Sequence, residues 1–318
     1  MCAKAPLGQR REQLSPSEDL WVILLAAGEG SRVRDLTRDR DGVLVPKQFC
    51  APDGSQSMLS WAMRRAARIA PMEHIVAVVA AQHRHWWQNE LSGMAQRNLA
   101  IQPHNRGTAV GILFPLLQIL GRDPGARVLV LPSDHYVGDE AILHDALIQA
   151  LDSVEADRSR IALLGMPARE SDPEYGWILP SCPTGEVCRV RAFVEKPDRT
   201  TARTLMCQGA VLNSFIIAGT GACLEHLYLR SMPRLVAQLV AWRDDETAGW
   251  PELEALYRRL PTSDFSRDVL QRSCDSLSVV RARACGWSDL GTPDRLRHHW
   301  GELSGPHARR SGVRGVNV

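Results

Sequence analysis

The 318-residue sequence contains no apolar run that approaches the roughly 20 residues a helix needs to span a bilayer. It also lacks a charge excess. The formal net charge is +2, which gives no reason to expect nucleic acid or an anionic membrane as the main partner. Residues 1–19 carry charges but lack the apolar core of a secretory signal. Together these absences favour a cytoplasmic protein.

Cysteine pairs with metal-binding spacing are absent as well. Eight cysteines are scattered along the chain, and none forms a Cys-x-x-Cys pair. We therefore expect mostly small, buried thiols in a reducing cytoplasm rather than a zinc site.

The patterning that is present indicates one α/β domain. A hydrophobic content of 44% is enough for a sizeable core. Short apolar runs alternate with helical patterns, which predicts a Rossmann-like, mostly parallel sheet flanked by helices over residues 20–302, with disordered ends at 1–19 and 303–318. Strands are expected at residues 21–27, 74–81, 127–131, 161–166, 190–194 and 276–283. Helices are expected at 57–69, 82–97, 109–120, 138–154, 200–208, 221–260 (with two interruptions) and 292–300.

The most informative stretch is residues 21–49. Its apolar run is typical of a buried parallel strand and ends in Gly28-Glu29-Gly30-Ser31-Arg32. Glycines let backbone N–H groups approach an anion closely. Arg32, and Lys47 within Pro46-Lys47-Gln48, can add positive charge to the same place. The pattern indicates a polyphosphate site, although such glycines are also common in ordinary tight turns.

Two better-known phosphate loops do not match these letters. The dinucleotide fingerprint needs a third small residue, where this chain has Val33. The Walker motif needs a closing Gly-Lys-Ser/Thr, which is missing. The loop is therefore neither the usual hydride-transfer loop nor a P-loop.

Two motifs together resemble the signature of sugar-1-phosphate nucleotidylyltransferases: Leu-Ala-Ala-Gly-Glu-Gly-Ser-Arg at 25–32 and Pro-Lys-Gln-Phe at 46–49. The second is most similar to mannose-1-phosphate guanylyltransferases. The resemblance implies that Ala27, Gly28 and Gly30 contact the nucleotide, and that Arg32 and Lys47 act on its phosphates. Because the family often has glycine where Ala27 stands, the identity of the base is left more open than the reaction.

Further motifs follow in the family's order. Arg106, Gly107 and Thr108 resemble the family's loop at the nucleotide base, and a helix start with free N–H groups suits a polar ring or phosphate. Asp134 in Pro-Ser-Asp-His and Asp289 in Trp-Ser-Asp resemble the family's two metal ligands. Both follow apolar strands, so we expect them to share one Mg²⁺ at the carboxyl edge of the sheet. In a site without metal, repulsion between the two carboxylates is expected to raise the pKa of at least one of them. The alternative is that each aspartate only caps a turn.

The second half of the chain resembles the family's sugar site less closely. Gly176, Glu195, Lys196 and Asn213 occupy the expected positions: the glycine to let a sugar ring lie against backbone, the lysine to meet the sugar phosphate, and the other two to bind hydroxyl groups. Elsewhere a Glu-Lys pair before a turn would be an ordinary surface feature. Two departures stand out, because Ser266 replaces an aspartate of the family and Gln271 replaces a glutamate.

The resemblance therefore predicts an Mg²⁺-dependent transferase. It would join a nucleoside triphosphate, expected to be GTP, to a sugar 1-phosphate, expected to be mannose 1-phosphate, and release pyrophosphate and GDP-mannose. Two alternatives stay open: the same chemistry with another sugar phosphate or with UTP or dTTP, and a catalytically weak regulatory protein that binds nucleotide sugars. The sequence leaves open whether the protein is a homo-oligomer.

Overall fold

The computed structural model describes residues 19–38 and 42–303. The flanks predicted to be disordered, 1–19 and 303–318, lie outside the described residues except for Asp19 and for Leu303, which is the last residue of the helix Pro293–Leu303. The sequence prediction also places Asp19 in the first flank. It instead directly precedes the first strand, where its carboxylate forms an ion pair with Arg127 at 2.8 Å.

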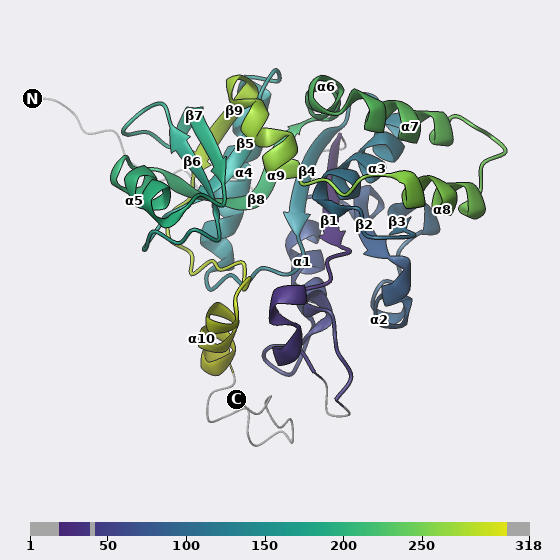
Figure 1. Cartoon of the computed structure of the whole chain (residues 1–318), viewed down its shortest axis with the longest axis horizontal. Coiled ribbons are helices and arrows are strands. Elements are labelled where there is room, and N and C mark those ends of the chain that lie inside the picture. Colours follow the sequence, from purple (N-terminus) through teal and green to yellow (C-terminus); the bar gives the residue numbers. More distant parts are fainter. Residues whose placement is uncertain (1–18, 39–41, 304–318) are drawn as a thin grey trace, which may run out of the picture.

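One nine-stranded sheet organises the described chain, in the order β3-β2-β1-β4-β8-β5-β9-β7-β6, with β6 also pairing with β8 (Figure 1). Its strands are β1 (Leu20–Ala26), β2 (Ile75–Ala80), β3 (Leu99–Gln102), β4 (Arg127–Pro132), β5 (Ile161–Met166), β6 (Gly176–Pro180), β7 (Val187–Glu195), β8 (Val211–Thr220) and β9 (Leu277–Arg281). β1 and β2 are fully or almost fully buried and carry runs of valine, isoleucine and leucine, as strands covered on both faces do.

The sheet is α/β as predicted, but it is more mixed than expected. β1 pairs in parallel with β2 and β4, and β2 pairs in parallel with β3. β8 then runs antiparallel to both β4 and β5, and β6 and β7 form an antiparallel hairpin. The parallel character that the apolar runs indicated therefore holds for the first four strands and for the β5–β9 pair.

Helices cover both faces of this sheet (Figure 1). They are α1 (Met58–Ala67), α2 (Arg84–Glu90), α3 (Gly107–Arg122), α4 (Glu140–Ala156), α5 (Arg199–Cys207), α6 (Gly221–Ser231), α7 (Pro233–Arg243), α8 (Trp250–Arg259), α9 (Phe265–Asp268) and α10 (Pro293–Leu303). Val22 and Leu24 of β1 pack in the apolar cluster that includes α1, α2, α4 and α5. Trp21 and Ile23 pack in the opposite cluster with α3 and α6–α9. Successive side chains of β1 point to opposite faces of the sheet, so this one strand contributes to two apolar clusters.

One predicted helix is much shorter than expected. The pattern over 82–97 predicts a continuous helix, but α2 ends at Glu90 and a separate turn of 3₁₀ helix, Gln96–Asn98, leads into β3. The chain must reverse there, and Ser92-Gly93 offers poor helix formers at that point.

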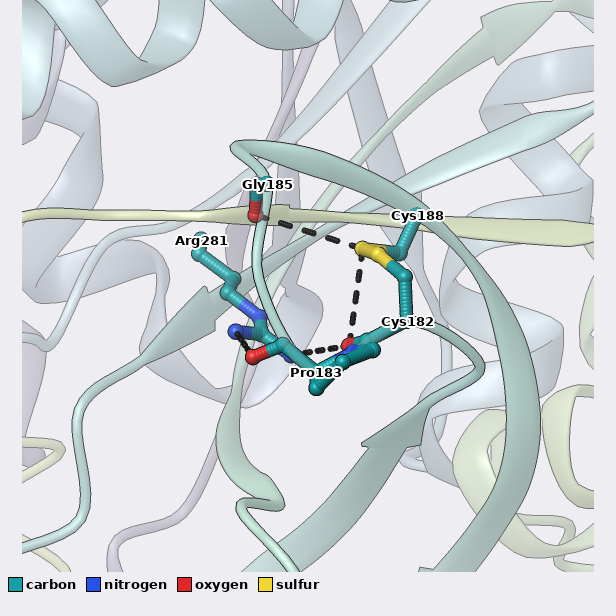
Figure 2. Close-up of a disulfide and its surroundings, with 5 residues drawn as sticks. All are labelled: Cys182, Pro183, Gly185, Cys188 and Arg281. Atoms are coloured by element: carbon teal, nitrogen blue, oxygen red, sulfur yellow. Dashed lines mark hydrogen bonds between the residues drawn. A yellow bond between two sulfur atoms is a disulfide. The ribbon is translucent and has the colours of Figure 1, made fainter.

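The prediction of mostly small, buried thiols is wrong, because among the described cysteines only Cys50, Cys188 and Cys285 are buried and one pair is oxidised. Cys182 and Cys188 form a disulfide across the connection between β6 and β7 (Figure 2). Arg281, at the end of β9, donates hydrogen bonds to the carbonyl oxygens of Cys182 and Pro183, at 2.7 and 2.9 Å. Cys50, Cys207, Cys223, Cys274 and Cys285 are free. Among residues 19–38 and 42–303, no helix has the length and apolarity that crossing a membrane requires.

Candidate functional site

The glycine loop after β1 is held open by a buried glutamine. The Gln48 amide donates to the carbonyl oxygens of Ala26 and Gly28, each at 2.9 Å. Gly30 has a φ of 60°, and a side chain there would press on Lys47. Gly28 has no atom within 4 Å of the point where a Cβ would lie. Ala27 is half-buried at the start of the loop. The loop thus has open space in front of its backbone, which an anion could fill.

We expect Gly28→Ala to weaken binding of a nucleoside triphosphate by at least about tenfold, or about 1.4 kcal/mol, while leaving the melting temperature unchanged. The new methyl group would meet no protein atom, so it can act only on what approaches the loop from outside. Isothermal titration calorimetry and a thermal melt of the same samples provide the measurement. Unchanged affinity would show that phosphate does not approach this backbone.

Lys47 lies at the centre of the site. Its side chain is only 5% exposed, and its ammonium nitrogen is 2.7 Å from Asp134 Oδ2 and 2.6 Å from the backbone oxygen of Asp289. A single cation therefore joins two loops that are 155 positions apart (134 and 289). These two acceptors stabilise the ammonium group in a position that is almost fully buried.

A short bridge brings the two aspartate loops together. Tyr136 and Ser288 exchange backbone hydrogen bonds of 2.9 and 3.0 Å in an isolated antiparallel bridge. Asp134 follows β4 closely, as predicted, whereas Asp289 lies eight positions beyond the end of β9 (281 to 289). The bridge, rather than a strand end, therefore sets the position of Asp289.

Asp134 is stabilised as a carboxylate. Burial alone would raise its pKa, but Lys47, and after it His135, outweigh this effect and hold the pKa of Asp134 below its ordinary value. The repulsion expected between two aspartates is therefore not what sets this group. Burial lowers the pKa of His135 to about 4, so its ring is neutral at neutral pH. Trp287 Nε1 donates to His135 Nδ1 at 3.2 Å, which leaves the ring proton on Nε2, 3.7 Å from Asp134 Oδ1.

Asp289 is paired with a different cation, which the sequence analysis did not identify. Arg295 Nη1 lies 2.6 Å from Asp289 Oδ1, which also accepts the Gly291 N–H at 2.9 Å. The guanidinium carbon of Arg295 lies 4.1 Å from the centre of the Tyr175 ring. No sequence motif marks an arginine six positions after the aspartate. The pairing becomes visible only in the structure, where the start of α10 places Arg295 beside Asp289.

Arg32 approaches the same region from the glycine loop. Its guanidinium is about half exposed and forms a 3.0 Å ion pair with Glu174. A side chain at Gly291 would meet both Asp289 Oδ2 and Arg32, so this glycine lets the two loops pack closely. Arg32 is thus accessible to an incoming phosphate. Binding that phosphate would require Arg32 to give up its ion pair with Glu174, which is weak because it is exposed.

The loop predicted to face the base is built mainly from internal contacts. The Arg106 guanidinium donates to the carbonyl oxygens of Tyr257 and Arg258, at 2.5 and 3.0 Å, and so caps the end of α8. Gly107 has a φ of 83°, and a side chain there would collide with the Ser263 backbone. Thr108 Oγ1 accepts the N–H of Phe265 at 2.8 Å. The side chains of Arg106 and Thr108 therefore support the loop. Part of its backbone is engaged as well, because the Gly107 N–H donates to Asn105 Oδ1 at 2.9 Å and the Ala109 N–H donates to the Ser263 carbonyl oxygen at 3.3 Å.

The residues predicted to bind sugar do gather in one place. Gly176 pairs with Glu195 across β6 and β7, and a Cβ on Gly176 would lie 2.5 Å from Glu195 Oε2 and 3.2 Å from the Cβ of Asn213. The space above Gly176 is therefore taken by the carboxylate of Glu195, not left for a sugar ring as we had expected. Lys196 is exposed and has a φ of 47°. Such backbone in a non-glycine residue is uncommon and concentrates at functional sites.

The two departures from the family pattern lie in this cluster. Asn213 Nδ2 donates to Ser266 Oγ at 3.4 Å, and Gln271 Oε1 accepts the backbone N–H of Glu195 at 2.9 Å. An amide oxygen at position 271 therefore makes the bond that a carboxylate could also make. The replacement removes a negative charge next to Glu195 without removing the acceptor.

Glu195 is a weaker acid than an ordinary glutamate. Burial, followed by the negative charge of Asp264, raises the pKa of Glu195 to about 7 from 4.5, although Lys196 and Arg267 act in the opposite direction. Near neutral pH this carboxyl group is a donor as well as an acceptor, which suits the hydroxyl groups of a sugar.

The raised pKa of Glu195 predicts how the folding stability of the protein depends on pH. Between about pH 4.5 and about pH 7 the folded protein binds more protons at Glu195 than the unfolded chain, so stability falls as the pH rises through this window and then levels off. Glu195→Gln removes this dependence. We expect the melting temperature of the variant, relative to the natural protein, to increase between about pH 5 and about pH 8. A difference that stays constant over this range would contradict the raised pKa.

Comparison with known proteins places the chain in a family. The family model described as nucleotidyl transferase matches residues 21–220, which carry the glycine loop, Lys47, Asp134 and the sugar cluster up to Asn213. The chain belongs to the nucleotidyl transferase family. It is 26% identical over 297 residues to the alginate biosynthesis protein AlgA of Pseudomonas aeruginosa, covering 90% of this chain and 58% of AlgA. It is 27% identical over 294 residues to the mannose-1-phosphate guanylyltransferase of Salmonella montevideo, covering 85% of this chain and 58% of that protein.

The fold of this nucleotidyl transferase is also found among solved structures. A protein from Thermus thermophilus, named mannose-1-phosphate geranyltransferase, superposes with a TM-score of 0.74 at 27% identity, over 86% of this chain and 76% of that one. The α/β fold class predicted from the sequence is thereby confirmed. The chain spans little more than half the length of the curated relatives that it matches.

Proposed function

We propose that this nucleotidyl transferase joins a nucleoside triphosphate to a sugar 1-phosphate. The observation that carries the proposal is the position of Lys47, which bridges Asp134 and Asp289 directly beside the open glycine loop. Cations and carboxylates are gathered where a triphosphate on the loop would place its reacting phosphates. The sugar cluster is tied to this centre through three consecutive residues. Glu174 pairs with Arg32, Tyr175 lies under Arg295, and Gly176 faces Glu195.

In the proposed reaction an oxygen of the sugar phosphate attacks the α-phosphorus. The bond from that phosphorus to the β-phosphate oxygen breaks, and pyrophosphate leaves. No protein nucleophile is needed, because the barrier comes largely from bringing anions together and positioning them. Lys47 would neutralise charge at the α-phosphate and the sugar phosphate, and Arg32 would bind the β- and γ-phosphates. Glu195 and Asn213 would bind the sugar hydroxyl groups, and Lys196 would lie near the sugar phosphate.

We further propose Mg²⁺ as the cofactor. No group of three or more His, Cys, Asp and Glu side chains in the described part of the chain could hold a metal alone. The protein offers two carboxylates, those of Asp134 and Asp289, and phosphate oxygens and water would complete the shell. Mg²⁺ prefers this ligand set, and when bound it would withdraw charge from phosphate oxygens.

For the substrates we propose GTP and mannose 1-phosphate, giving GDP-mannose. This choice rests on the Pro-Lys-Gln-Phe motif at 46–49 and on relatives such as the Salmonella mannose-1-phosphate guanylyltransferase. The test is pyrophosphate release from a matrix of GTP, ATP, CTP, UTP and dTTP against several sugar 1-phosphates with Mg²⁺. Release that is fastest with GTP and mannose 1-phosphate would support the proposal. A faster reaction with UTP or dTTP would reassign the base.

A regulatory protein that binds nucleotide sugars is the second candidate, because Ser266 and Gln271 replace two acids of the family. Both replacement side chains make hydrogen bonds within the sugar cluster, to Asn213 and to the backbone of Glu195. This candidate predicts tight binding of GDP-mannose without pyrophosphate release from any pair in the matrix. Restoring the acids through Ser266→Asp and Gln271→Glu would then be expected to raise turnover from zero.

A further inference from the structure

Arg295 is tied to the proposed metal site by several contacts. Its side chain is 14% exposed, and Nη1 is 2.6 Å from Asp289 Oδ1. Nε donates to Thr292 Oγ1 at 3.1 Å. Nη2 is buried, lies 3.8 Å from Asp172 Oδ2 and has no hydrogen-bond partner. The guanidinium lies against the Tyr175 ring. Such a rigid, desolvated arginine is a fixed positive charge rather than a mobile surface group.

In the free protein both aspartates are thus neutralised by internal cations. Asp134 is paired with Lys47, and Asp289 is paired with Arg295. One oxygen of Asp289 is committed to two donors, Arg295 and the Gly291 N–H. The surrounding packing holds the turn between Asp289 and Gly291 in place. Leu290 has a φ of 48° and is fully buried, and such a conformation persists only where the surrounding structure enforces it.

This arrangement opposes the binding of a divalent cation on its own. A positive charge in direct contact with a ligand carboxylate cancels much of that carboxylate's attraction and repels the approaching ion. A triphosphate changes the balance, because it brings several negative charges. Arg295 lines a cavity of about 270 Å³ together with Trp287, His298 and His299.

We propose that Arg295 is the internal counter-ion of Asp289, a positioning residue that keeps this carboxylate from holding a divalent cation until a nucleotide is bound. The proposal rests on the proposed function, since it takes Asp289 to be a metal ligand. In this role Arg295 would let the metal bind only together with the triphosphate. It would also prevent divalent cations from binding to the site when no nucleotide is present.

The experiment measures Mn²⁺ binding to the full chain by electron paramagnetic resonance, without nucleotide or sugar phosphate. We expect the natural protein to bind Mn²⁺ weakly and Arg295→Gln to bind it at least about tenfold more tightly. Arg297→Gln is the matched control. It removes an arginine from the same helix that pairs with Asp294 instead, at 3.0 Å, and should behave like the natural protein.

A double-mutant cycle separates the counter-ion role from general loss of structure. Asp289→Asn alone should change Mn²⁺ affinity little, because that carboxylate is already engaged. The same change in the Arg295→Gln background should abolish the gained affinity. If Arg295→Gln melts early, Arg295→Met retains the stem over Tyr175 and Arg295→Lys retains the charge. The first should bind Mn²⁺ tightly and the second weakly.

Unchanged or weaker Mn²⁺ binding by folded Arg295→Gln or Arg295→Met would overturn the proposal. It would show that Arg295 supports Asp289 as a ligand instead of blocking it. The failure of the proposed function is a different result: no pyrophosphate release by the natural protein with any substrate pair. Because Mn²⁺ binding is measured without substrates, the two outcomes can be told apart.

Discussion

Lys47→Ala is expected to lower kcat by a factor on the order of 100 or more, which corresponds to the loss of about 3 kcal/mol of transition-state stabilisation. The ammonium group would neutralise charge that builds up during transfer, and its two protein contacts place it between the aspartate loops. Steady-state pyrophosphate release at saturating substrate and Mg²⁺ is the measurement. Turnover close to that of the natural protein would remove Lys47 from the reaction.

The same variant should also lose stability, on the order of 1–3 kcal/mol, because Asp134 loses its cation partner. The loss is held to this range because the Asp134 side chain is still 34% exposed and water can reach it. Adding Asp134→Asn to Lys47→Ala should recover most of the stability and none of the turnover. This double variant separates the catalytic effect from the structural one, since only the structural effect is repaired.

Asp134→Asn and Asp289→Asn should each lose most of their turnover, on the order of 100-fold, and raised Mg²⁺ or Mn²⁺ should restore part of it. The double variant should be little worse than either single one, because under the proposed function both changes would weaken binding of the same ion. Rates measured across a Mg²⁺ titration test this. Stability will also respond, because Lys47 and Arg295 each lose a partner.

If each aspartate merely shapes the turn in which it lies, the result is different. The variants would melt earlier, yet their residual rates would keep the Mg²⁺ dependence of the natural protein, and the two losses would add. A matched control is Asp294→Asn, whose carboxylate pairs with Arg297 on the surface of α10. It should leave both the rate and the Mg²⁺ dependence unchanged.

The sequence by itself determined the fold class, the family and the order of the motifs. The buried strand β1 and the glycine loop could be predicted because their signals are local: an apolar run sets a strand, and glycine permits backbone that other residues resist. The positions of Glu195 and Asn213 followed from their motifs, and the structure places them together beside Gly176.

Only the tertiary structure decided what each charge contacts. Lys47 contacts Asp289 from 242 positions away, and Arg106 contacts Tyr257 from 151 positions away. No motif marks the pairing of Arg295 with Asp289. The mixed second half of the sheet and the Cys182–Cys188 disulfide were likewise not predicted. The physical reason is that a local pattern sets the backbone of its own segment, whereas an ion pair depends on where packing brings a distant partner and how much water it excludes.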